Sequence, residues 1–183
     1  MGYPMRLMYL SVSLIGMLAL NACSTAPKSA LGKADIENDA AVAMAKAKTS
    51  NPSLVNIFNS AASCAVFPSI GKGAAGVGGA YGKGVLYEGS VPVGYCDLSQ
   101  ASIGLQLGGQ SYTEIIAFES QQAEATFKQG NFRFDAQATA VALKSGAGAN
   151  AKFTNGVAVF TMDETGLMYE ASLGGQKFSY QAR

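Results

Sequence analysis

The sequence predicts an α+β protein in which a few short helices precede an antiparallel, glycine-rich sheet that curls toward a barrel. Two observations carry this prediction. Residues 33–61 are rich in alanine and contain no glycine, whereas the chain beyond them alternates short apolar runs with most of its 22 glycines. Many short strands separated by glycine turns favour a barrel-like antiparallel sheet, and helices then cover one face or one end.

Three helices are expected. Residues 33–48 lack glycine and proline, and their acids come early and their lysines late, which suits the helix dipole. Asn51 and Pro52 predict the cap and first residue of a second, short helix. Ser120 is expected to cap a third helix that runs to Gln129 and stops at Gly130.

Strands are expected over most of the chain after Ala65. The turn Glu88-Gly89-Ser90 predicts a hairpin between two of them, and apolar residues alternate with glycine and glutamine over residues 103–107, which is typical of a half-buried strand. The predicted strands are 76–87, 91–95, 103–107, 113–118, 131–134, 136–143, 156–162, 167–173 and 176–180, with a turn over 163–166.

A lipoprotein signal peptide is predicted ahead of this domain, over Met1–Ala22. Arg6 precedes an apolar run over residues 7–20 that is short for a spanning helix. The run ends in Leu-Asn-Ala-Cys, which resembles the bacterial lipobox and implies an acylated Cys23; the alternative is ordinary cleavage before Cys23. Ser24 after the cysteine indicates the outer membrane, facing the periplasm. Residues 23–33 are then a flexible tether, and residues 34–183 form a single domain.

Charge and composition exclude several classes of function. The chain has 13 Lys and Arg and 12 Asp and Glu, and removal of Arg6 with the signal peptide leaves 12 of each. A net charge near zero argues against nucleic-acid binding. The chain has no histidine, which excludes Ser-His-Asp and Cys-His catalysis and histidine-based metal sites. We therefore expect a non-enzymatic protein without a metal or cofactor.

The remaining cysteines, Cys64 and Cys96, form an even pair in a chain predicted to reach the oxidising periplasm. Such a pair favours a disulfide, which would stabilise the fold by about 3–4 kcal/mol in the chain-entropy model. The alternative is two buried free thiols.

Residues 65–86 hold seven glycines between Gly71 and Gly84. Residues 71–76 match the pattern G-x-G-x-x-G, but a dinucleotide site also needs a following helix, and this stretch is strand-like. Glycine-flanked amides can form a concave anion site, so the candidate headgroup-binding residues are Lys72, Gly73, Lys83 and Gly84. The alternative is that the glycines permit tight strand packing and that both lysines are solvated.

Five segments in order resemble the SYLF domain, a lipid-binding module of bacterial lipoproteins and eukaryotic trafficking proteins. They are 65–86, 102–110, 114–130, 135–148 and 157–175, within a match over about residues 35–177. The resemblance implies association with acidic membrane phospholipids, including phosphoinositides. Family members in eukaryotes also use a basic amphipathic helix, but residues 33–48 have acids in their first half and a thin apolar face.

The sequence thus favours a non-enzymatic, envelope-anchored module that binds acidic phospholipids. The alternative is a structural outer-membrane lipoprotein of the glycine-zipper kind, in which residues 78–82 and 104–108 (both G-x-x-x-G) pack helices in a membrane. The strand-like alternation over residues 103–107 argues against that alternative.

Overall fold

The computed structural model describes residues 25–75, 77–103, 110–132, 134, 141–142, 152–163 and 175–183. The helices in these ranges are α1 (Ala30–Ser50), α2 (Leu54–Ser60) and α3 (Gln121–Lys128). The strands are β1 (Ser63–Ala75), β2 (Val77–Glu88), β3 (Val91–Ile103), β4 (Gln110–Phe118), β5 (Val141–Ala142), β6 (Val157–Asp163) and β7 (Gln176–Ala182). The predicted signal peptide Met1–Ala22 and Cys23 lie outside the described residues.

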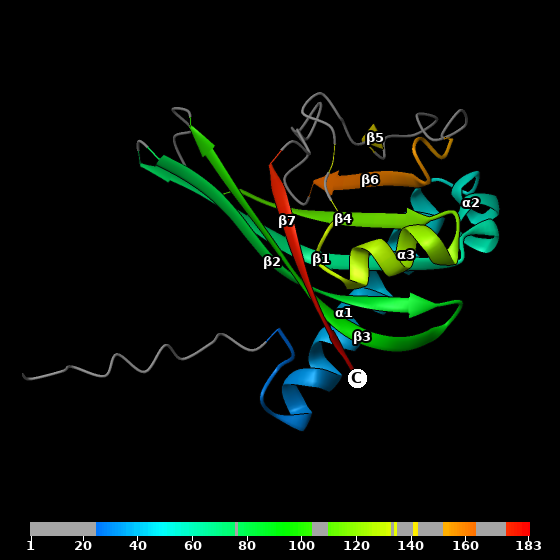
Figure 1. The fold of residues 1–183 in the computed structure, drawn as a ribbon, viewed down its shortest axis with the longest axis horizontal. Coiled ribbons are helices and arrows are strands. Elements are labelled where there is room, and N and C mark those ends of the chain that lie inside the picture. Colours follow the sequence, from blue (N-terminus) through cyan, green and yellow to red (C-terminus); the bar gives the residue numbers. More distant parts are fainter. Residues whose placement is uncertain are drawn as a thin grey trace, which may run out of the picture.

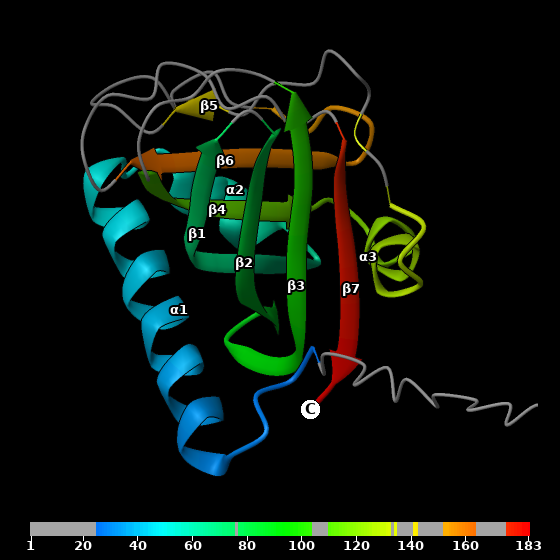
Figure 2. The same cartoon turned by 90° about the vertical axis from the view of Figure 1, so that its left-hand side faces the viewer.

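The strands form one sheet in the order β5-β6-β4-β1-β2-β3-β7, which confirms the α+β prediction. All neighbouring pairs are antiparallel except β5 and β6. The sheet twists strongly, so that β4 and β6 run across the direction of β3 and β7 (Figures 1 and 2). Within the described residues its outermost strands, β5 and β7, are not paired with each other. The sheet is therefore open, and the predicted barrel is not closed.

An irregularity at Pro68 explains part of this curvature. The register of β1 shifts between Val66 and Ser69 against β2, and between Phe67 and Ile70 against β4. Proline has no N–H to donate to a ladder, and a bulge bends its strand and increases the local twist. The hydroxyl of Thr113 donates to the Pro68 carbonyl at 2.7 Å and ties the bulge to β4.

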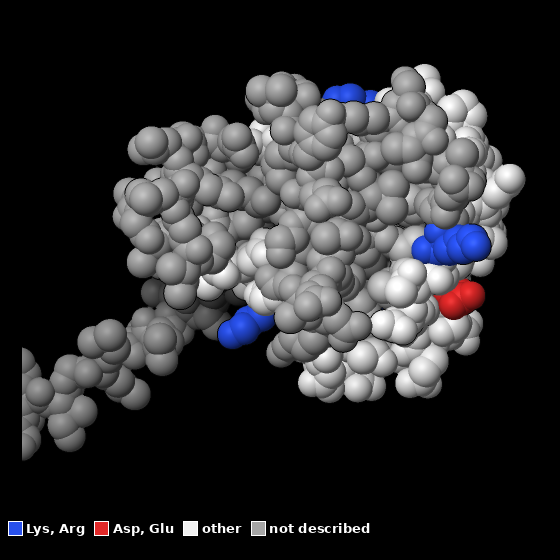
Figure 3. All heavy atoms as spheres, turned by 90° about the horizontal axis from the view of Figure 1, so that it is seen from above, with Lys and Arg blue, Asp and Glu red and all other residues white. Residues whose placement is uncertain are grey.

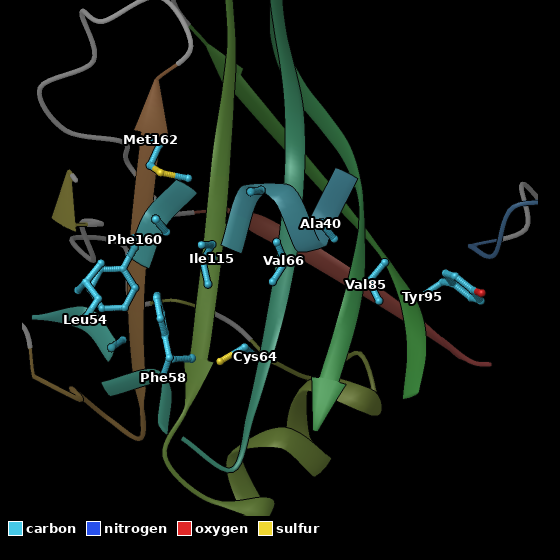
Figure 4. Close-up of a cluster of buried hydrophobic side chains, with 14 of the residues drawn as sticks. Ala40, Leu54, Phe58, Cys64, Val66, Val85, Tyr95, Ile115, Phe160 and Met162 are labelled. Carbon is cyan, nitrogen blue, oxygen red and sulfur yellow. The ribbon is translucent and has the colours of Figure 1, made fainter. Parts of the chain in front are cut away.

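Each face of the sheet carries its own hydrophobic cluster. The outer face, which α1 and α2 cover, buries Val66, Val85, Ile115 and Phe160. The buried residues of helix α1 are all alanines (Ala40, Ala43 and Ala47), with Ile36 and Met44 partly buried beside them, so the helix lies close to β1 and β2 (Figure 4). Phe58 of α2 meets Phe160 edge to face, with ring centroids 5.5 Å apart.

The opposite, inner face is aromatic and faces α3. Phe127 of α3 packs against Phe118 of β4 and Phe178 of β7, with ring centroids 4.9 and 5.3 Å apart. Phe132 and Phe134 join this cluster. Because β4 and β7 are separated by three strands in the sheet, their shared contact with α3 shows that the sheet curls around its inner face.

Most predicted elements are present, with shifted boundaries. Helix α1 begins at Ala30, earlier than predicted, because the Ser29 hydroxyl accepts from the Gly32 N–H at 3.0 Å and caps it. Asn51 is the C-cap of α1, and α2 starts at Leu54 after Ser53, so the predicted cap at Asn51 and first helical residue at Pro52 are wrong. The hairpin turn at residues 89–90 and the Ser120 cap of α3 are confirmed, and Gly130 has a φ of 70°.

Several predicted strands are absent or differ. Strand β3 continues to Ile103, so a separate strand does not begin there, and residues 104–109 lie outside the described part. Asn131, Phe132 and Phe134 are not in a strand. Of the predicted strand 136–143 only β5 is described, and 167–173 lies outside the description. Gly78 and Gly82 lie in β2, so the alternative of a helical glycine zipper is wrong for residues 78–82.

The predicted disulfide is also wrong: Cys64 and Cys96 are free, buried thiols. Cys64 packs in the outer cluster beside the helices and Cys96 in the inner cluster. The sheet therefore separates the two sulfur atoms, and a disulfide needs β-carbons within about 4.5 Å of each other.

Candidate functional site

A row of polar side chains crosses the outer face of the sheet where α1 no longer covers it. Lys83 of β2 lies opposite Asp97 of β3, which lies opposite Ser179 of β7. The Lys83 ammonium is 2.9 Å from the Asp97 carboxylate, and their side chains are 35% and 14% exposed. Burial acts to lower the pKa of Lys83, but the hydrogen bond and charge of Asp97 outweigh it and raise that pKa above its ordinary value. Lys83 is therefore a cation at any physiological pH.

The chain just before α1 lies on this row. The Thr25 carbonyl accepts a hydrogen bond from the Lys83 ammonium at 3.1 Å, and the Thr25 and Ser179 hydroxyl oxygens are 3.0 Å apart. The next residue, Ala26, donates its N–H to the side chain of Gln181 at 3.1 Å and is buried. Figure 2 shows this segment beside β3 and β7. Thr25 and Ala26 thus belong to the folded domain, although the sequence predicts a flexible tether there.

The next row of the same face is open to solvent. Tyr81, Ser99 and Lys177 lie opposite one another on β2, β3 and β7, and all three are exposed. Tyr81 is 50% exposed, and the Lys83 ammonium lies 5.9 Å from the centre of its ring, within the range of a cation–π contact. Two ammonium groups and a phenol therefore share one strip of the sheet, which we call the Tyr81 face (Tyr81, Lys83, Ser99 and Lys177).

The four predicted headgroup residues do not lie together in one described site. Lys72 and Gly73 lie opposite Ala80 and Gly79, but their side-chain surroundings are outside the described part. Gly84 has a packing role, because an added β-carbon would lie 2.6 Å from the Val66 carbonyl oxygen and 2.7 Å from the Phe67 ring. Lys83 is the member of the set whose described side chain lies on the Tyr81 face.

The sequence pattern did not indicate that Lys83 shares its face of the sheet with Tyr81, Ser99 and Lys177. Period-two alternation could have placed Tyr81 and Lys83 on one face of a strand. It could not supply Ser99 and Lys177, because they reach this face only through the pairing of β2 with β3 and of β3 with β7.

A buried polar group lies on the inner face. Glu114 of β4 accepts a hydrogen bond from the side-chain amide of Gln176 of β7 at 3.0 Å, and the two side chains are 0% and 1% exposed. Tyr112 lies two residues away on β4, and burial, followed by the charge of Glu114, raises the pKa of its hydroxyl well above the usual value. The sequence gives no sign of this group, because β4 and β7 meet only through the curl of the sheet.

Charged side chains on the described part of the face seen from above are scattered (Figure 3). The described atoms visible from above carry single charges and no continuous basic patch (Figure 3). Lys128 of α3 pairs with Glu124 and, at 3.0 Å, with Glu88, which ties α3 to the β2–β3 hairpin. Among the described residues, no group of three Asp, Glu, Cys or His side chains could hold a metal ion. No helix among them is long and apolar enough to span a membrane.

The part of the chain that supplies Ser99 and Lys177 to the Tyr81 face is similar to a known protein family. Residues 99–182 match the Ysc84 family, described as Las17-binding protein actin regulator. This part of the chain is therefore similar to the Ysc84 (SYLF) domain family. The SYLF match includes the end of β3 and all of β4, α3, β5, β6 and β7. It contains Ser99 and Lys177, whereas Tyr81 and Lys83 precede it. It confirms the resemblance for residues 99–182 and points to lipid binding in general terms.

A relative supports the same assignment. Beta cell expansion factor A of Aeromonas veronii is 27% identical over 84 residues, which are 46% of this chain and 32% of the relative. The similarity thus spans about a third of the relative's length.

Proposed function

We propose that this protein is a non-enzymatic, envelope-anchored module that binds the headgroups of acidic phospholipids through the Tyr81 face. The observation that carries the proposal is the juxtaposition of Tyr81, Lys83 and Lys177 on an exposed strip of the sheet. The match of residues 99–182 to the SYLF family supports it. Binding of phosphoinositide-type headgroups follows from the family resemblance.

The chemistry of the strip suits a phosphate at a membrane surface. Lysine ammonium groups contact phosphate oxygens as point charges, so they accept several headgroups. Lys177 is exposed, whereas Lys83 is already paired with Asp97 and would share its charge with the phosphate. Tyrosine has an apolar ring and a polar hydroxyl, which suits the boundary between headgroups and acyl chains. Such contacts are weakened by salt.

The anchor in this proposal is an acylated Cys23, which would hold the domain at the outer membrane, facing the periplasm. Support for it comes from the signal-like segment Met1–Ala22 and the lipobox-like residues 20–23. Mass measurement of the mature amino terminus from bacterial membranes tests the anchor directly, because an unmodified Cys23 would refute it.

The headgroup function is tested by co-sedimentation of residues 24–183 with vesicles. We expect binding to phosphatidylglycerol, cardiolipin and phosphoinositide vesicles, little binding to phosphatidylcholine, and weakening at high salt. Lys177→Ala should lower the partition coefficient about fivefold, the usual contribution of one lysine at an anionic surface. Lys72→Ala tests the other lysine of the glycine hairpin, and Lys152→Ala, at an exposed position before β6, is the matched control. Equal binding to neutral and anionic vesicles would refute the proposal.

A further inference from the structure

We propose that the segment before α1 is an orienting clamp, which fixes the Tyr81 face against the surface of the bilayer that holds the acyl anchor. This inference rests on the proposed function, because it needs an acylated Cys23. The membrane then contacts the side of the domain that carries the Tyr81 face, and Thr25 and Ala26 determine this orientation.

The chain between the anchor and the folded domain is very short. Thr25 is bound to the sheet through Lys83 and Ser179. Only two peptide units separate it from Cys23. An extended chain spans at most about 3.6 Å per residue, so the Cys23 α-carbon stays within about 7 Å of that of Thr25. The acyl chains must therefore enter the membrane beside the row formed by Lys83, Asp97 and Ser179.

Several contacts hold the segment before α1 on the sheet. Contacts from Thr25 and Ala26 reach two strands, β2 through Lys83 and β7 through Ser179 and Gln181. Ala26 is 5% exposed and belongs to the outer hydrophobic cluster. Several contacts to two strands resist rotation better than one contact would. A flexible ten-residue linker, in contrast, has a root-mean-square span of about 17 Å and would let the domain turn freely.

The surface beside the anchor is exposed and suits a membrane. Tyr81, Ser99 and Lys177 form the row adjacent to the clamp, and their neighbours Gly79 and Ala101 are small and exposed. A small-residue surface lets the sheet approach the headgroups closely, while Lys177 meets their negative charge. The occupant to which we commit is therefore an anionic bilayer surface.

Fluorescent labelling of the full-length, acylated protein in phosphatidylethanolamine–phosphatidylglycerol vesicles tests the clamp. A polarity-sensitive dye is attached to Ser99→Cys on the Tyr81 face and, as the matched control, to Gln122→Cys on α3, which packs on the opposite face. The native thiols Cys64 and Cys96 are buried, so the dye reacts selectively with the introduced cysteine. We expect lipid-borne quenchers to act at least threefold more strongly on the Ser99 dye than on the Gln122 dye.

A second variant tests the orientation without touching the fold. Ten glycine and serine residues inserted between Ser24 and Thr25 lengthen the anchor and leave the described contacts in place. The difference between the two dyes should then fall by more than half, while the protein stays bound to the vesicles. Equal quenching of both dyes with the native anchor, or an unchanged difference after the insertion, would overturn the clamp.

Failure of the clamp and failure of the proposed function give different results. If residues 24–183 sediment with anionic vesicles and Cys23 carries acyl chains, but the dyes do not differ, the clamp alone is wrong. If neither binding nor acylation is found, the proposed function fails, and the clamp fails with it.

Discussion

Replacement of Gly84 by alanine separates the two interpretations of the glycine-rich hairpin, close packing and headgroup binding. A β-carbon at Gly84 would lie 2.6 Å from the Val66 carbonyl oxygen and 2.7 Å from the Phe67 ring. The oxygen belongs to a paired strand and cannot rotate away. At Gly71, in the neighbouring strand of the same hairpin, the nearest atom is the Tyr81 carbonyl oxygen at 4.0 Å. Gly71→Ala is therefore the matched control.

The size of the effect follows from these distances. Overpacking of a core by a methyl group costs about 1–3 kcal/mol, and contact with a fixed backbone atom places Gly84→Ala near the upper end. The lower entropy of the unfolded alanine variant offsets about 0.4–1 kcal/mol. We expect a net loss of about 2 kcal/mol in the free energy of unfolding, which lowers the melting temperature by about 4–8 °C for a chain of this length.

Urea and thermal unfolding of residues 24–183, followed by circular dichroism, measure both variants. Gly71→Ala should leave stability unchanged or slightly raised, because its added methyl group meets no close neighbour and the unfolded chain loses entropy. The packing argument is refuted if Gly84→Ala unfolds at the same urea concentration as the native protein, or if Gly71→Ala is equally destabilised. A stable Gly84→Ala variant that loses lipid binding would instead favour a headgroup site at Gly84.

Three further predictions follow from buried or paired groups. Burial raises the pKa of the Cys64 thiol to about 12 and raises that of Cys96 as well. A thiol reagent should therefore label neither cysteine in folded residues 24–183 and both after unfolding without reductant, whereas the absence of any label after unfolding would show that the two cysteines form a disulfide. Glu114→Leu removes the acceptor of the Gln176 amide and should cost about 1–3 kcal/mol of stability in urea, whereas an unchanged midpoint would show that the bond contributes nothing. The pKa of Lys83 is raised in the folded state, so its ion pair with Asp97 contributes fully to the free energy of unfolding below the unfolded pKa of about 10.4, and this contribution is lost as pH rises through the folded pKa. The stability of the native protein should therefore fall toward that of Lys83→Met at strongly alkaline pH. A difference in stability between the two proteins that stays constant with pH would contradict the ion pair.

Features that depend on near neighbours in the chain were predictable. The Ser120 side chain caps the first turn of α3, and Gly130 adopts the positive φ that ends a helix. The hairpin turn likewise has a positive φ at Gly89. These interactions span only a few residues, so the local sequence determines them wherever the element lies in the fold.

Features that depend on strand register were not predictable. The spacing of Cys64 and Cys96 is compatible with a disulfide, but the sheet places the two thiols on opposite faces. The four glycine-hairpin residues resemble one anion site in sequence, yet Gly84 is buried under Val66 and Phe67, and Lys83 is paired with Asp97. The face on which a residue lies changes with a shift of one position in the ladder, and the bulge at Pro68 makes such a shift.

The sequence by itself therefore determined the class of fold, most of the helices and turns, and a family resemblance that the comparison confirms over residues 99–182. Only the tertiary structure decided which lysines share a surface and that the segment before α1 lies on it. The physical reason is range: capping and turn formation act between adjacent residues, whereas the contacts of Thr25 with Lys83 and Ser179 join positions 58 and 154 residues apart. Those contacts exist only once the sheet has assembled in its register.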